Sequence, residues 1–474
     1  MTGHPEMHPS PAACAQALLA PEQVRPVLAA LIEQTLDGLE ARGAAHAWRI
    51  EAPVQPIDPV EWLAAQEAPV KVYWADRAGR FRVAGVHAAD RMACAHADET
   101  ADIFRRIATR VASGHPNLRY FGGLRFSDQG QRDAAWEPFG YASFVLPRFE
   151  LLTHGDQSYL ACNLFIDRDT SPETLLDETL AALDALSFSP TPWPASSIRI
   201  LARGDAPDSS LWNETVAHTL RRIRKNDAAK VVLARATRFS FDAPPHPLAF
   251  MARLTALPSR AYRFLYQPQP GVAFLGASPE RLYSRHMRHI ESEAVAGTRP
   301  RGATPETDGA LGEALRASDK EQREHAFVAK AVHAALQSLC SAVHSDAAPT
   351  VLHLPNCQHL YRRFEGFLDT RDDEAILRAL HPTPAVGGAP TDRACAIIAE
   401  VEPFDRGWYA GPVGYIGCDN AEFAVAIRSG LVENDTVTLF TGAGIVEGSD
   451  AHAEWDELEN KMGAFRSALE DHAD

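Results

Sequence analysis

Residues 421–465 read AEFAVAIRSGLVENDTVTLFTGAGIVEGSDAHAEWDELENKMGAF. Glu422–Leu431 is rich in apolar side chains, with the cationic Arg428 inside the run. An Asn-Asp turn follows, and a second apolar run leads to Gly442 and Gly444. The pattern predicts a strand, a turn, a second strand, a glycine loop and then a helix.

The predicted helix carries two stripes of side chains. Its core stripe, at helical spacing, consists of Trp455, Leu458, Met462 and Phe465. Glu454, Glu457 and Lys461 fall on a neighbouring stripe, so two carboxylates and an ammonium share one face. The alternative is a solvated face, on which a Glu457–Lys461 pair stabilises the helix by a few tenths of a kcal/mol.

Composition restricts the class of protein. With 474 residues, 46% of them hydrophobic and 23% charged, the chain has an ordinary globular composition. Its net charge of −16 argues against nucleic acid or an anionic membrane as a partner. An anionic substrate would need local cations or a metal ion. The seven scattered cysteines form no CxxC motif, and no apolar run approaches the ~18 residues of a membrane span, which indicates a reduced, cytoplasmic protein.

The N-terminal region indicates shape more than chemistry. Its apolar runs include Ser143–Leu152 and Tyr159–Ile166, on either side of a His-Gly-Asp turn, and its acidic and histidine residues show no metal-ligand spacing. Ser187–Ser197, SFSPTPWPASS, holds three prolines and four serines and is the candidate linker.

Two candidate proton-transfer residues follow. Lys230 begins the strand pattern KVVLAR, and on one face with Val232 and Ala234 its ammonium would be desolvated, which lowers its pKa and favours a base. The alternative is a strand-end lysine that reaches solvent. Glu280 in FLGASPE follows Pro279 at a strand exit, where partial burial would raise its pKa towards that of a general acid.

A second pair of glutamates predicts a metal site. Glu321 and Glu324, in SDKEQREH, repeat the i,i+3 spacing of the pair in the last helix, although Glu321 also fits a capping box. Two such helices packed side by side would gather four carboxylates, which need a divalent cation; their all-oxygen ligands favour Mg²⁺. The turn-rich Glu293–Gly302 is a weak anion-binding candidate, and His359 is expected on a loop.

Ten sequence blocks in a fixed order carry a family resemblance. They are KVVLAR, GASPE, EAVAGTRPRG, SDKEQREH, QHL, HPTPAVGG, FDRGWYAGPVGY, VAIRSG, TGAGIV and EWDELENK. The chain resembles the chorismate-utilising enzymes, most closely the isochorismate synthases, over residues 205–465, whereas residues 1–200 match loosely. The resemblance implies an α/β fold of the α+β type, in which two large antiparallel sheets pack face to face with helices outside. It also implies one structural unit, in which the candidate linker is a surface loop.

The resemblance implies a role for each site residue. Lys230 matches the base that activates water for attack at C2 of chorismate, and Glu280 matches the acid that protonates the departing C4 hydroxyl. Glu324 and Glu457 match direct Mg²⁺ ligands, which Glu321 and Glu454 support through water. The substrate-binding positions are matched by Gly297, Thr298, His359, Ala385, Tyr409, Arg428, Gly442, Gly444 and Lys461.

The resemblance also separates branches of the family. Amine-transferring relatives lack the lysine at 230 and use a glutaminase partner. The lysine here implies that water is the nucleophile and that no glutaminase partner is needed. The expected oligomeric state is a monomer or a weak dimer. Salicylate synthases share the lysine and remain the alternative, but Ala385 stands where that branch tends to carry threonine. A chorismate-binding subunit without catalysis is a further alternative. A dinucleotide site at Gly442 and Gly444 lacks the third glycine and the βαβ setting. A product destined for menaquinone or for a siderophore fits the sequence equally.

Overall fold

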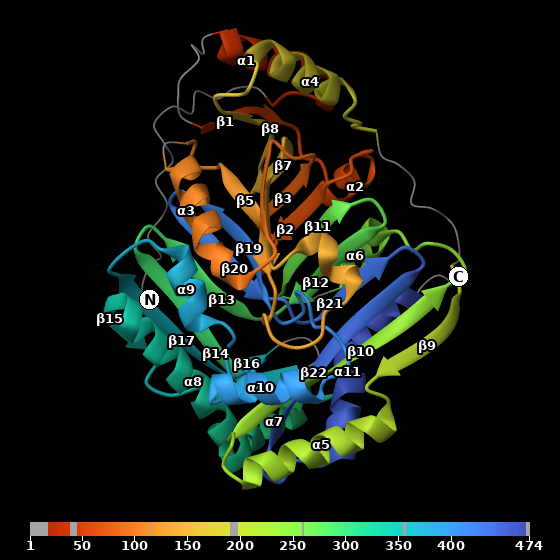
Figure 1. Cartoon of the computed structure of the whole chain (residues 1–474), viewed down its shortest axis with the longest axis vertical. Helices are drawn as coiled ribbons and strands as arrows, with labels where there is room; N and C mark the ends of the chain where they lie inside the picture. Colours follow the sequence, from red (N-terminus) through yellow and green to blue (C-terminus); the bar gives the residue numbers. More distant parts are fainter. Residues whose placement is uncertain are drawn as a thin grey trace.

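Two antiparallel sheets form the centre of the molecule and pack face to face, with the helices outside them (Figure 1). The computed structural model describes residues 18–37, 45–112, 114–189, 198–257, 260–353 and 357–470. In the described residues, no helix combines the length and the apolar character needed to cross a membrane. The arrangement confirms the predicted two-sheet fold.

The first sheet has twelve strands. In spatial order they are β1 (His46–Val54), β8 (Gln157–Ile166), β7 (Phe149–His154), β3 (Phe81–Val86), β2 (Lys71–Ala75), β11 (Tyr262–Gln269), β12 (Val272–Ser278), β21 (Ser429–Glu433), β22 (Thr436–Val446), β10 (Lys230–Phe241) and β18 (Gly388–Ala389). The twelfth strand, β9 (Ile200–Ala206), pairs with β10.

The second sheet has ten strands. In spatial order they are β15 (Cys340–Ser345), β17 (Cys357–Leu368), β14 (His289–Pro300), β13 (Arg281–His286), β20 (Asn420–Val425), β19 (Pro412–Gly417), β5 (Arg119–Leu124), β6 (Ala142–Leu146) and β4 (Asp90–Cys94), and β16 (Thr350–His353) pairs with β17.

Both sheets contain strands from both parts of the chain. The N-terminal strand β2 pairs with β11 in the first sheet, and the N-terminal strand β5 pairs with β19 in the second. Most of the candidate linker lies outside the described residues, so a boundary near residue 200 stays a prediction. The N-terminal region thus completes the two sheets that carry the site.

Aromatic side chains fill the space between the sheets. Trp74 of β2 packs edge-on against Tyr415 of β19, with ring centroids 6.0 Å apart, and the hydroxyl groups of Tyr266 on β11 and Ser143 on β6 lie 2.7 Å apart. Trp408 is fully buried beside Tyr266. Each contact joins elements far apart in the sequence, so the core depends on both sheets being complete.

The helices cover the outer faces of the sheets and their ends. They are α1 (Pro21–Asp37), α2 (Pro59–Ala64), α3 (Thr100–Val111), α4 (Pro172–Asp184), α5 (Ser209–Arg224), α6 (Pro247–Ala256), α7 (Pro305–Ala317), α8 (Asp319–Leu339), α9 (Asp373–Leu380), α10 (Thr391–Val401) and α11 (Ala451–Glu470). Helices α1, α2, α4, α6 and α11 share an apolar core with the outer face of the twelve-stranded sheet. Helix α8 packs on β14 and β17 of the other sheet.

Two predicted strand runs are wrong because the chain changes sheet within them. The run at Ser143–Leu152 is divided at Pro147 into β6 of the ten-stranded sheet and β7 of the twelve-stranded sheet. Proline has no N–H for the ladder, which suits this interruption. The run at Glu422–Leu431 is likewise divided into β20 and β21, and Arg428 stands between them with φ of 51°.

Candidate active site

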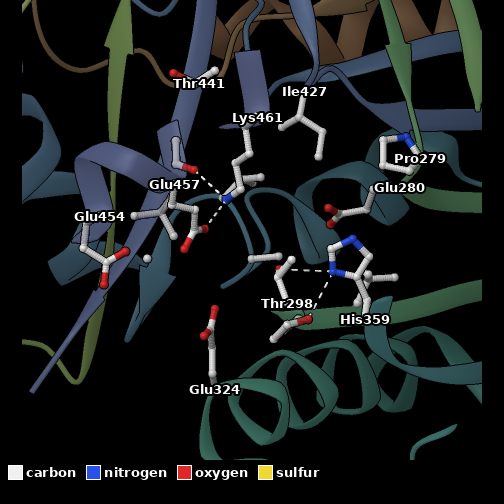
Figure 2. Close-up of a pocket in the computed structure, with 18 of the residues that line it drawn as sticks. Pro279, Glu280, Thr298, Glu324, His359, Ile427, Thr441, Glu454, Glu457 and Lys461 are labelled. Atoms are coloured by element: carbon white, nitrogen blue, oxygen red, sulfur yellow. Dashed lines mark hydrogen bonds and ion pairs between the residues drawn. The ribbon is translucent and has the colours of Figure 1, made fainter. Parts of the chain in front are cut away.

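A cavity of about 260 Å³ lies where the two sheets meet α8 and α11. Fourteen of the fifteen predicted site residues line it, and they are Glu280, Gly297, Thr298, Glu321, Glu324, His359, Ala385, Tyr409, Arg428, Gly442, Gly444, Glu454, Glu457 and Lys461. The remaining one, Lys230, contacts Glu324 of the cavity wall. Figure 2 shows Glu280 and His359 on one side of this space and Glu454 and Glu457 on the other. The structure therefore brings together residues spread over more than half of the described chain.

Lys230 is buried at the start of β10, with 1% of its surface exposed. Its Nζ donates a hydrogen bond to Glu324 Oε1 at 2.8 Å. The amine is buried, as predicted, but its surroundings are not purely apolar, since a carboxylate from α8 reaches it. Burial acts to raise the pKa of Glu324, but the Lys230 charge and hydrogen bond outweigh it and hold that pKa below its ordinary value.

Glu280 lies between β12 and β13, the passage from one sheet to the other. Its side chain is buried, and this burial, together with the negative charge of Glu293, raises the pKa of Glu280 to about 8. The carboxyl group is therefore mostly protonated near neutral pH. A buried carboxylic acid at the wall of a polar cavity is suited to donate a proton.

The four predicted metal-site glutamates come from α8 and α11. The carboxylate of Glu321 pairs with Arg299 at 2.8 Å, and that of Glu457 pairs with Lys461 at 2.6 Å. Burial, followed by the charge of Glu457, raises the pKa of Glu454. Helix α8 packs on β14 and α11 packs on β22, so the predicted side-by-side packing of the two helices is not what brings the carboxylates together.

Cations lie on the side of the cavity formed by α11 and the β20–β21 passage. Arg428 has no carboxylate within 4.0 Å among the described residues; its guanidinium donates to the backbone oxygen of Lys461 at 3.1 Å. Lys461 Nζ donates to Gly442 O at 2.8 Å as well as to Glu457. An unpaired guanidinium at the cavity wall is a ready partner for an anionic ligand.

The imidazole of His359 presents a neutral ring to the cavity. Its Nδ1 lies 3.1 Å from the carbonyl oxygen of Gly297 and 3.2 Å from Thr298 Oγ1. Because a carbonyl oxygen only accepts, Nδ1 carries the proton. Burial lowers the pKa of His359 to about 4, so Nε2 stays an acceptor near neutral pH, and Cys357 Sγ lies 3.2 Å from it.

Residues 32–470 match the family model described as chorismate binding enzyme. The chain belongs to this family. It is similar to isochorismate synthase 2, chloroplastic, of Arabidopsis thaliana, with 36% identity over 378 residues that cover 78% of this chain and 67% of the plant protein. It is also similar to isochorismate synthase MenF of Escherichia coli (strain K12), with 33% identity over 421 residues, 87% of this chain and 91% of MenF. The solved structure of MenF, the menaquinone-specific isochorismate synthase from Escherichia coli, covers 94% of this chain with a TM-score of 0.83 and 31% identity.

Two glycines of this chorismate-binding enzyme leave room for polar atoms. A Cβ at Gly444 would lie 3.0 Å from Lys230 Cε and 3.3 Å from Glu324 Oε1, and a Cβ at Gly442 would lie 2.9 Å from the Tyr409 hydroxyl. Both glycines are in β22, so the predicted glycine loop is wrong: the strand continues to Val446, and α11 begins at Ala451. Glycine within a strand here permits close side-chain approach.

Two other predicted loops of the enzyme are also strands. Residues Glu293 to Pro300 belong to β14, whose register shifts at Gly297, where φ is 76°. His359 lies in β17, beside Thr298 across the ladder. The bulge turns the Gly297 carbonyl towards His359, which explains why a turn-forming residue stands inside a strand.

Sequence reasoning missed several residues at or behind the cavity wall. Lys320 lies 3.9 Å from Glu454 Oε1, and Thr441 lines the cavity. Arg406, which is buried, donates to Glu402 and to the backbone oxygen of Val232 at 2.7 Å. Lys320 stands in SDKEQREH and Arg406 in FDRGWYAGPVGY, so both were inside quoted motifs, but no spacing indicated where their side chains point.

Proposed function

We propose that this chain is an isochorismate synthase, which converts chorismate to isochorismate with water as the nucleophile. The observation that carries the proposal is a buried amine, Lys230, which contacts the wall of a cavity lined by Glu280, a carboxylic acid mostly protonated near neutral pH. The same cavity is lined by Arg428, which has no carboxylate within 4.0 Å among the described residues. Similarity to plant and bacterial isochorismate synthases over three quarters or more of the chain supports this reaction.

In the proposed reaction, Lys230 Nζ takes a proton from water as the oxygen attacks C2 of the ring. The ring double bonds shift, and the C4 hydroxyl leaves as water with the proton of Glu280. One water is consumed and one released, so the conversion is an isomerisation. The hydrogen bond from Nζ to Glu324 Oε1 holds the amine in position for this step.

The cations of the cavity hold the carboxylates of the substrate. Arg428 is suited to a carboxylate because its guanidinium lacks an acidic partner in the described chain, and Lys461 adds a second charge. Thr298 Oγ1 is suited to a hydroxyl group of the substrate, since it accepts from His359 Nδ1 and can donate its own proton. His359 is proposed to contact the substrate beside it, where a hydroxyl group would compete with Cys357 Sγ for Nε2. The remaining proposed contacts are made by Gly297, Ala385, Tyr409, Gly442 and Gly444.

The glutamates fit a bound Mg²⁺ ion. Their oxygens are hard donors, and the buried Glu454, whose pKa is raised beside Glu457, is a carboxylate that a cation would stabilise. No three acidic, histidine or cysteine side chains in the described residues form a ready-made cluster. Mg²⁺ commonly takes only one or two protein carboxylates, so in our proposal Glu324 and Glu457 would hold the ion directly and Glu321 and Glu454 would act through water. When bound, the ion supplies positive charge for a substrate carboxylate.

Removal of Mg²⁺ with EDTA is expected to abolish turnover, and added Mg²⁺ is expected to restore it. Glu457→Gln should weaken Mg²⁺ binding at least about tenfold by calorimetric titration, because a neutral amide is a poorer ligand. Glu313→Gln, on the exposed face of α7, is the matched control. Full turnover in the metal-free enzyme would contradict the four-carboxylate site.

Chorismate is expected to yield isochorismate as the released product, without stoichiometric pyruvate or salicylate. The reason is that Ala385 presents a methyl group to the cavity and no hydroxyl. No amino product is expected when ammonia is present. Product chromatography with a coupled pyruvate assay, calibrated with added pyruvate, makes the measurement. Stoichiometric pyruvate would assign the chain to the salicylate synthases. Chorismate binding without any product would indicate a chorismate-binding subunit.

A further inference from the structure

An ion pair with a buried carboxylate and a partly buried guanidinium lies behind the proposed general acid. Glu293 of β14 is 3% exposed, and its Oε1 forms a salt bridge with Arg77, in the turn between β2 and β3. The same oxygen accepts the backbone N–H of Arg281 at 2.9 Å. Arg281 is the residue after Glu280, so the carboxylate of Glu293 fixes the backbone that carries the acid.

Arg77 reaches Glu293 from the opposite sheet. Its guanidinium lies over the ring of Tyr262, 5.0 Å from the centroid, and the Tyr262 hydroxyl accepts from Arg281 Nε at 2.8 Å. Within the described residues, the buried Glu293 Oε2 and Arg77 Nε have no hydrogen-bond partner. The salt bridge, the hydrogen bond from Arg281 and the Tyr262 ring therefore fix the position of the pair, and its charges act on neighbouring groups.

Opposite charges act on Glu280 from the two members of this pair. After burial, the charge of Glu293 is what raises the pKa of Glu280 most, whereas Lys230, Arg77 and Lys461 lower it. The titratable and charged groups that face Glu280 are Glu293, Lys230, Arg77, Lys461 and Tyr409, and His359 lies beside it on the same side of the cavity. Those that face Glu293 are Arg77, Arg281, Tyr262 and Tyr361.

We propose that Arg77 and Glu293 are a positioning pair for the general acid, which orients the Glu280 backbone and sets how firmly its carboxyl group holds its proton. This inference rests on the proposed function. It gives the N-terminal region, through the β2–β3 hairpin, a direct part in the chemistry of the site. Neither residue lines the cavity, so neither is assigned contact with the substrate.

The two members of the pair are expected to move the pH profile in opposite directions. In Glu293→Gln the negative charge is lost while the shape is kept, so Glu280 ionises more easily and the alkaline limb of kcat/KM shifts down by about one pH unit. In Arg77→Gln the cation is lost, so the limb shifts up by about one pH unit. The double variant is expected to return towards the wild-type profile, and Arg77→Lys, which keeps the charge, to stay near it.

Arg80→Gln is the control, because Arg80 is exposed in the same turn and its replacement removes an equal charge. If the pair only supports the fold, each variant will have a lower melting temperature or kcat, but the alkaline limb of kcat/KM will not move. That result would overturn the proposal. Shifts of the limb in the same direction in both single variants would also overturn it. The infrared band of the protonated carboxyl group, assigned by its loss in Glu280→Gln, reports the Glu280 proton without turnover. Absence of turnover in the wild type would contradict the proposed function alone, since the band would still show the opposite shifts.

Discussion

Replacing Lys230 with Gln is expected to lower the turnover of chorismate by ~10²- to 10⁴-fold, the usual cost of a lost general base. The amide of Gln cannot take a proton from water, but it can still donate a hydrogen bond to Glu324. In the wild type, Glu324 Oε1 lies 2.8 Å from the lysine amine. Substrate binding should persist, because Arg428 and Lys461 are unchanged. Steady-state product formation and equilibrium chorismate binding measure the two effects separately.

Lys330→Gln, on the exposed side of α8, is the matched control and is expected to turn over normally. Lys230→Arg separates charge from basicity, since a guanidinium keeps the charge but does not release its proton. Near-normal turnover in Lys230→Gln, with circular dichroism showing a folded protein, would mean that the lysine only anchors the strand. Near-normal turnover in Lys230→Arg would mean that the reaction needs the positive charge at this position and not a group that takes up a proton.

Replacing Glu280 with Gln is expected to lower turnover by a similar ~10²- to 10⁴-fold, because the leaving hydroxyl loses its proton donor. In the wild type, kcat/KM should fall as the pH rises through about 8, where burial and Glu293 place the pKa of this acid. The active form is the protonated one, so the loss occurs on the alkaline side. Glu214→Gln, an exposed position on α5, should leave both turnover and pH profile unchanged.

The Glu280→Gln variant is also expected to be more stable than the wild type at alkaline pH. The pKa of Glu280 is raised from 4.5 to about 8 in the folded state, so the stability linked to its proton is fully present below pH 4.5 and is lost as the pH rises through 8. An amide side chain at this position has no charge to bury, so the melting temperature of the variant should exceed that of the wild type by a few degrees above pH 8. An equal melting temperature at every pH would contradict the burial of this charge.

The fold and the family were predictable from the sequence because the motifs keep their order along the chain. The two-sheet architecture and the chorismate-binding family are confirmed. The cavity residues were predictable for the same reason, although their roles stay predictions. The helical stripe of Glu454, Glu457 and Lys461 also follows from spacing alone, since a helix fixes which side chains share a face.

The parts that sequence reasoning missed depend on tertiary structure. Apolar runs do not show where the chain passes from one sheet to another, so the strands divided at Pro147 and Arg428 were predicted as single runs. Two glycines close together in a sequence are typical of a loop. In β22, however, the absence of their side chains makes room for Lys230 and Tyr409, which belong to other segments of the chain. The carboxylate beside Lys230 comes from α8, almost a hundred residues later, and local pattern carries no sign of it.

The passages between the sheets also have a mechanical consequence. Glu280 stands where the chain leaves β12 for β13, and Arg428 stands where it leaves β20 for β21. Each passage is a covalent tie between the two layers, like the one at Pro147, so each resists sliding of one layer over the other at its own position. The proposed acid and the Arg428 cation therefore stand on covalent connections between the layers, which limit how far the two sides of the cavity can move apart.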